Sequence, residues 1–164
     1  MSELPNGWAA TTIGEITEIS SGFGFPKHLQ GKTAGRFPFA KVGDISNSVR
    51  SKHGQLSEAE NYVDDDDLAV LRARPVPAGS TVFAKIGEAL KLNRRAIARA
   101  DVVLDNKCMA VSPKNGIEPD FVYHYMKTID LGPMSIATTV PSVRRGDIES
   151  IEVALPPNQE QRRI

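Results

Sequence analysis

Residues 151–164 read IEVALPPNQEQRRI. Every second residue of the first half is apolar, which predicts a half-buried strand over Ile151–Leu155. The two prolines that follow cannot extend a strand and form a stiff joint. Asn158 can then cap a helix whose polar first turn is Gln159–Arg163. The stretch therefore predicts the last strand of a domain followed by the start of a separate helix.

Short strand-like runs dominate the chain before this stretch. Turn-forming dipeptides such as Asn6-Gly7 and Asn115-Gly116 separate them. The predicted strands are Trp8–Ile13, Ile16–Ser20, Phe37–Val42, Thr81–Ile86, Arg95–Ala100 and Lys107–Val111, with Val102–Leu104 extending a neighbouring strand.

Helices are fewer. The clearest is Pro119–Leu131, where proline suits the first turn and apolar residues recur at i, i+3, i+4 and i+7 from Val122. Ser57–Glu60 has the spacing of a capping box, and Ser142 can cap a turn of helix that runs to Ile148. Because strands and helices do not alternate regularly, we predict an α+β fold, a strand-rich single domain with a few short helices.

The length of 164 residues suits one domain with a hydrophobic core. No apolar run approaches the ~20 residues that span a bilayer, and the N-terminal MSELPNGW lacks the pattern of a secretory signal. The single cysteine, Cys108, excludes an internal disulfide framework and fits a reducing compartment. We therefore expect a cytoplasmic protein.

The formal net charge is zero, but the charges are unevenly distributed. Residues 27–52 contain six Lys or Arg and one acid, and residues 72–99 contain seven and one. Residues 53–71 contain six acids and no Lys or Arg. Since binding to a polyanion depends on local potential, the pattern permits a basic surface that binds nucleic acid, and equally permits ordinary solvated faces.

Enzyme motifs are weak or absent. The sequence LPPN at residues 155–158 has the residue types of an adenine-methyltransferase motif in the wrong order. No glycine-rich loop opens a helix after a strand to cradle a dinucleotide or S-adenosylmethionine. The three histidines and Cys108 lack zinc-ligand spacing. We expect no cofactor, no metal and no catalytic residues.

One arrangement resembles the site of a metal-dependent nuclease, which needs converging carboxylates and a lysine near the scissile phosphate. Asp105 and Lys107 have the carboxylate-x-lysine spacing, and Glu88 lies upstream on a different predicted segment. Because such triplets are common by chance, a small metal-dependent nuclease that uses these three residues is only the alternative function. A protein-interaction module is a third possibility.

Three polar stretches, residues 22–28, 46–53 and 91–95, have the composition of loops that enter a DNA groove. Arginine pairs with guanine and asparagine with adenine, while lysine and serine usually contact phosphates. The candidate DNA contacts are Lys27, Asn47, Arg50, Lys52, Lys91, Asn93, Arg94 and Arg95, and a further polar run adds Thr138, Thr139, Ser142, Arg144 and Arg145.

Several blocks in order along the chain resemble one known family. These are LPNGW (4–8) with IGEI (13–16), SGFGFP (21–26) with FPFAKVGDI (37–45), VPAGSTVFAKIG (76–87), and the closing VPS…DI…VALPPNQEQ (140–161). Together they are similar to specificity subunits of type I restriction-modification enzymes, at the N-terminal target recognition domain. Each block alone is weak, and the set covers nearly the whole chain.

The resemblance implies a non-catalytic, sequence-specific reader of duplex DNA. In that family each of two recognition domains reads one half of a gapped site, and long helices set the spacing and bind modification (methyltransferase) subunits, which restriction subunits then join. It implies a DNA target recognition domain over residues 1–156 and the start of a spacer helix over residues 157–164. We expect the chain to be a fragment of such a subunit, with a natural half-length subunit as the alternative.

Overall fold

The computed structural model describes residues 3–135 and 140–164, and its central feature is a sheet with a hydrophobic core on each face. Alternate residues of its strands face the two cores: Phe83 and Met109 on one face, Val82 and Ala110 on the other. All four residues of strand β6 are buried for this reason. The sheet has the order β2 (Thr17–Ser21), β9 (Cys108–Pro113), β6 (Thr81–Ala84), β7 (Ala96–Ala98) and β4 (Gln55–Leu56).

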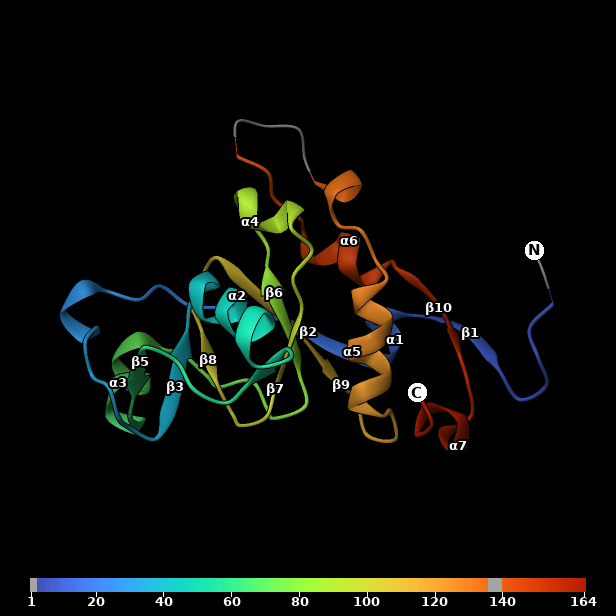
Figure 1. Cartoon of the computed structure of the whole chain (residues 1–164), viewed down its shortest axis with the longest axis horizontal. Helices are drawn as coiled ribbons and strands as arrows, with labels where there is room; N and C mark the ends of the chain where they lie inside the picture. The colour runs from blue at the N-terminus through green and yellow to red at the C-terminus, as the bar shows by residue number, and fades with distance from the viewer. Residues whose placement is uncertain (1–2, 136–139) are drawn as a thin grey trace.

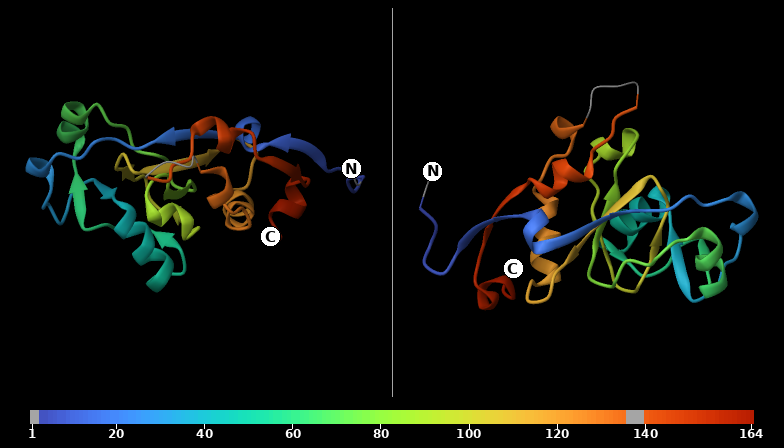
Figure 2. Two further views of the ribbon diagram at one scale, coloured as in Figure 1. Left: turned by 90° about the horizontal axis from the view of Figure 1, so that it is seen from above. Right: turned by 180° about the vertical axis from the view of Figure 1, so that it is seen from behind.

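Helices cover both faces of this sheet. On one face α5 (Pro119–Lys127) packs with α1 (Ile13–Ile16) and α6 (Arg145–Glu149). On the other face α2 (Val42–Ser51) inserts the buried side chain of Ile45. Strand β7 contacts both α2 and α5. Both helices lie on the side of the molecule away from β1 and β2 (Figures 1 and 2).

A second sheet forms the opposite end of the molecule from the termini (Figure 1). Its order is β5 (Asn61–Val63), β3 (Phe37–Ala40) and β8 (Val103–Leu104), and α3 (Asp65–Leu71) packs against it. Phe25 stacks on Phe39 with ring centroids 3.7 Å apart. The aromatic residues of the 22–28 stretch thus contribute to a small third core.

The two ends of the chain pair with each other. Strand β1 (Ala9–Thr12) forms an antiparallel ribbon with β10 (Glu152–Leu155), and α7 (Asn158–Gln161) follows. The remaining short helices are η1 (Lys27–Leu29), α4 (Glu88–Lys91) and η2 (Gly132–Met134).

The fold class is confirmed, since mixed sheets with a few helices form one domain. The predicted strands are present with boundaries shifted by a few residues, and the predicted helix from Pro119 ends at Lys127 instead of Leu131. Val102–Leu104 does not extend a neighbour in the central sheet. Its last two residues form β8, which pairs in parallel with β3.

Four local predictions are wrong. Asn158 does not cap α7, because Pro157 holds the N-cap position and Asn158 is the first helical residue. Residues 57–60 are not helical, because the chain there runs from β4 to β5 and no apolar face follows Ser57. The 46–53 stretch is not a loop: α2 occupies most of it, since Asp44 accepts the backbone N–H of Lys41 and starts the helix. Ser142 does not cap α6. It pairs with Ile86 in a β-bridge, and Arg144 is the capping position.

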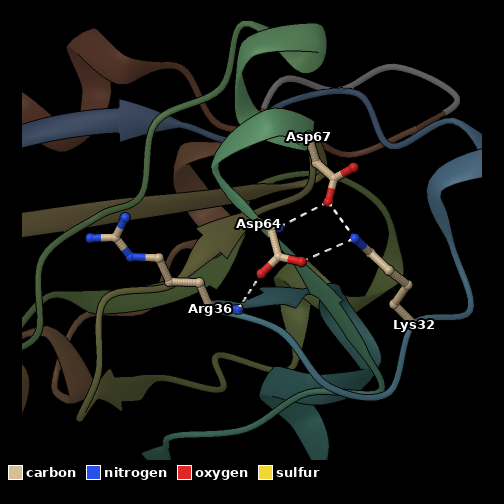
Figure 3. A network of polar contacts seen from close by, with 4 residues as sticks. All are labelled: Lys32, Arg36, Asp64 and Asp67. Atoms are coloured by element: carbon tan, nitrogen blue, oxygen red, sulfur yellow. Dashed lines mark hydrogen bonds and ion pairs between the residues drawn. The ribbon is translucent and has the colours of Figure 1, made fainter.

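Figure 3 shows how the long 22–36 loop is fastened to α3. The Lys32 Nζ atom lies 2.7 Å from Oδ2 of Asp67 and 3.3 Å from Oδ2 of Asp64. The Arg36 backbone N–H donates to Oδ1 of Asp64 at 2.8 Å. Asp67 also accepts the backbone N–H of Asp64 and so closes a capping box at the helix start. We call these four residues the α3 clasp.

The α3 clasp is expected to open at both extremes of pH. The hydrogen bond from the Arg36 backbone lowers the pKa of Asp64, and the bond from Lys32 lowers the pKa of Asp67. Their stabilisation is present above the ordinary aspartate pKa and is lost as pH falls through the lowered values. The pKa of Lys32 is raised, mainly by Asp67, so its contribution is present below the ordinary lysine pKa and is lost as pH rises through the raised value.

Amide hydrogen exchange of residues 22–36 measured against pH checks this prediction. In the native chain at acid pH, these amides should exchange faster than the intrinsic pH dependence of amide exchange alone would give. In a Lys32→Ala variant it should be fast already at neutral pH, whereas Lys27→Ala, an exposed lysine of the same loop, should behave as the native chain. Equal protection of the loop in all three proteins would refute the clasp.

Candidate nucleic-acid interface

A concave surface of about 450 Å³ lies where the C-terminal end of α2, the α4–β7 turn and α5 meet. We call it the basic hollow. No aspartate or glutamate lines it, and two of the three candidate DNA stretches, 46–53 and 91–95, meet there. Its lining residues are Val49, His53, Gly54, Leu92, Asn93, Arg94, Arg95, Tyr123 and Lys127.

Asn93 holds the turn that forms one wall of the basic hollow. Its backbone is left-handed, with φ of 52°. Its side-chain Nδ2 donates to Oδ1 of Asp130 at 2.9 Å, and its Oδ1 accepts the backbone N–H of Leu131 at 2.9 Å. The bond from Asn93 is the main reason that the pKa of Asp130 is lowered. Both polar atoms of the Asn93 side chain therefore bond within the protein, where they join the turn to the segment after α5.

Arg95, a candidate DNA contact, is buried instead: it immediately precedes β7 and is 3% exposed. Its guanidinium lies over the Phe83 ring, 5.2 Å from the centroid, and Nη2 donates to the backbone oxygen of Ile129 at 3.0 Å. Burial lowers its pKa to about 10, which leaves the group charged at neutral pH. Arg95 therefore cannot touch a base edge directly.

The opposite wall comes from the end of α2 and from α5. His53 is left-handed, with φ of 53°, and Gly54 follows with φ of 79°. A Cβ on Gly54 would lie 2.1 Å from the Tyr123 hydroxyl oxygen, so only glycine lets this turn approach α5. The Nζ atom of Lys127 lies 5.0 Å from the centroid of the Tyr123 ring. Lys127 lies in a helix and in none of the three candidate stretches, so no sequence pattern pointed to it.

The other candidates on α2 face a different environment. Asn47 and Lys52 line a separate hollow together with the acids Asp44, Glu58 and Glu60. The Nζ atom of Lys52 lies 3.5 Å from Oε1 of Glu58. The carboxylates of this hollow repel phosphate groups and offset the charge of Lys52, so this side of α2 is a poor surface for DNA. Arg50 is exposed in the last turn of the helix.

The remaining candidates lie apart from the basic hollow. Lys27 is exposed in η1, on the end of the molecule that carries the second sheet (Figure 1). Arg144 and Arg145 are exposed at the start of α6, which lies on the side of β1 and β2 (Figure 2). Arg145 pairs with Glu149 at 3.2 Å. Thr138 and Thr139 lie outside the described residues.

The family model described as the type I restriction modification DNA specificity domain matches residues 5–164. The chain belongs to this family. The MjaIX specificity subunit of Methanocaldococcus jannaschii is 20% identical over 171 residues, which cover 100% of this chain and 38% of that protein. This specificity domain therefore spans less than two fifths of the relative it matches.

Solved structures confirm the fold of the specificity domain. One is a chain of a type I R-M system described by its complex assembly and conformational transition, with a TM-score of 0.73, 16% identity and coverage of 99% of this chain and 37% of that chain. Another is the HsdS subunit of Thermoanaerobacter tengcongensis, with a TM-score of 0.68, 16% identity and coverage of 99% and 36%.

The nuclease alternative has no support in the specificity domain. Glu88 is 82% exposed at its side chain and pairs with Lys91 at 3.7 Å. The Asp105 carboxylate accepts the backbone N–H of Lys107 at 2.8 Å and so closes a turn. Across residues 3–135 and 140–164, no three His, Cys, Asp or Glu side chains are grouped to hold a metal ion.

Two further features of the specificity domain bear on the sequence predictions. Cys108 is buried, and burial is the main cause that raises the pKa of its thiol, in keeping with an inert packing role. Within the described part of the chain, no helix is both long enough and apolar enough to span a membrane.

Proposed function

We propose that this domain binds duplex DNA in a sequence-specific way, as the reader of one half-site of a type I restriction-modification specificity subunit. The observation that carries the DNA-binding part of the proposal is the basic hollow, a concave surface with cationic walls and no acidic lining residue. Such a surface attracts a polyanion even on a protein of zero net charge. The specificity family supplies the expectation that the polyanion is DNA.

The proposed contacts differ from the sequence-based set. Arg94 and Lys127 are the central proposed contacts, and His53 lines the same hollow. Exposed cations outside the hollow remain proposed peripheral contacts, and they are Lys27, Arg50, Lys91, Arg144 and Arg145. Asn93 and Arg95 act within the fold, and Asn47 and Lys52 face acids, so none of these four is proposed to read bases.

The domain division is also a proposal. Residues 1–156 would be the recognition domain and residues 157–164 the start of a spacer helix, consistent with a chain that spans 38% of its relative. The domain itself would be non-catalytic and cytoplasmic. Methyl transfer and cleavage would belong to modification and restriction subunits, which bind the rest of the specificity subunit.

Selection from a random duplex pool tests the proposal. The purified chain should enrich one short motif, and its affinity should fall as salt rises, with a slope of about −0.9 per phosphate contact. Arg94→Ala together with Lys127→Ala should weaken binding at least about tenfold, since each removes a charge-assisted contact. Lys114→Ala, an exposed lysine on the turn before α5, is the matched control. Enrichment of no motif would count against sequence-specific reading.

A further inference from the structure

The charge of Arg95 is incompletely compensated inside the protein. The residue is 3% exposed, and its Nε atom has no hydrogen-bond partner among the described residues. It forms no ion pair with a described acid. The nearest candidate, Asp130, attracts Arg95 only through space, because its Oδ1 accepts instead from Asn93 and from the backbone N–H of Gly132. Burying a cation without a paired acid destabilises the folded state, because only a well-placed counter-charge offsets the loss of hydration.

Arg95 lies at the basic hollow, where further positive charge is gathered. Arg94 and Lys127 line the same surface, and neither pairs with a described acid. Fields from a buried charge are less screened by water than those from a surface lysine, so Arg95 strengthens the positive potential in the hollow without touching its contents.

The polar groups of the hollow suit a phosphate better than a base edge. A bidentate adenine contact needs a free amide, and both side-chain atoms of Asn93 are used inside the protein. What remains is the positive charge of a guanidinium and an ammonium, those of Arg94 and Lys127, around a space of about 450 Å³. Arginine and lysine are the usual phosphate ligands at such a surface.

We propose that the basic hollow is a phosphate-binding site in which Arg94 and Lys127 contact the anion and Arg95 supplies buried charge beneath it. On DNA it holds a backbone phosphate and anchors the duplex independently of sequence, a role that rests on the proposed function. Sequence is then read by residues outside the hollow.

The first experiment uses inorganic phosphate and the full chain, followed by ¹⁵N NMR. The Nε–H of Arg95 and the amides of residues 53, 54 and 92–95 should shift with phosphate and saturate. Arg94→Ala and Lys127→Ala should each weaken phosphate binding by about tenfold, while Lys114→Ala should leave it unchanged. Shifts spread over unrelated lysines, or absent from the hollow, would overturn the proposal.

Arg95→Met separates an electrostatic role from a structural one. Methionine keeps an unbranched chain over Phe83 and removes the charge, so the melting temperature should be maintained or raised while phosphate affinity falls by about tenfold. A lowered melting temperature with unchanged phosphate affinity would show that Arg95 serves packing alone. If this variant does not fold, the two surface variants still decide the question.

A duplex arm distinguishes a DNA phosphate from free phosphate. Lys127→Ala should weaken every duplex by the same factor and reduce the salt slope by about one. Loss of preference for one sequence only would show that the hollow reads bases and would overturn the anchoring role. If the native chain binds phosphate but Lys127→Ala leaves the duplex affinity unchanged, the site binds free phosphate instead of a DNA phosphate. Binding of phosphate without binding of any duplex would refute the proposed function and leave the phosphate site standing.

Discussion

Replacing Gly22 by alanine is expected to destabilise the domain by about 4 kcal/mol or more, enough to unfold many domains of this size. An added Cβ would lie 1.9 Å from the backbone oxygen of Asp105 and 2.5 Å from that of Leu104. Neither neighbour is a side chain that can turn away, since both are backbone atoms. The Gly22 N–H also donates to Cys108 and that of Phe23 to Leu104, so the chain cannot shift without losing hydrogen bonds.

Gly24→Ala in the same SGFGFP motif is the matched control, because a Cβ there would meet nothing within 4 Å. Its effect should stay within about 0.5 kcal/mol. Urea unfolding of both variants gives the comparison. Similar stabilities of the two variants would contradict the close packing of β2 against the β8–β9 turn.

Gln161→Ala is expected to release α7 from the domain. Gln161 is 3% exposed, its Nε2 donates to the backbone oxygen of Pro156 at 2.8 Å, and its Oε1 accepts the backbone N–H of Glu118 at 3.0 Å. Removing the amide leaves two backbone groups unsatisfied, at about 1–3 kcal/mol each. The helix can avoid most of that penalty by detaching into water, so the expected change is local.

Trp8 reports on this detachment. It is the single tryptophan of the chain, and its Nε1 donates to Oε2 of Glu160 at 2.9 Å. Its emission should shift to the red and become more accessible to acrylamide in Gln161→Ala. Gln159→Ala, an exposed glutamine of the same helix, should leave both unchanged. If the two variants behaved alike, Gln161 would not be the residue that fixes α7.

Local sequence patterns predicted the elements whose signals lie within one segment. The apolar spacing of Pro119–Lys127 and the alternation of Ile151–Leu155 both correspond to observed elements. Helix α2 escaped notice because Ser46, Asn47 and Ser48 have poor helix propensity. Burial of Ile45 against the central sheet, a tertiary effect, stabilises it.

The candidate site was predictable only in part, for a similar reason. The sequence identified the 46–53 and 91–95 stretches, and the fold brings them together. It could not show that Arg95 is buried, because its partner Ile129 is 34 residues away. Likewise Phe25 lies in a stretch with the composition of a groove-entering loop, yet its ring stacks on Phe39, a distant residue of β3.

Whether this domain selects a DNA sequence can be measured in a hybrid enzyme. The domain would replace the first recognition domain of a complete type I specificity subunit, and methylated sites would be mapped across a genome with the modification subunits present. One half of the gapped methylated site is expected to change while the other half is retained. An active hybrid whose methylation map is identical to that of the original subunit would contradict it.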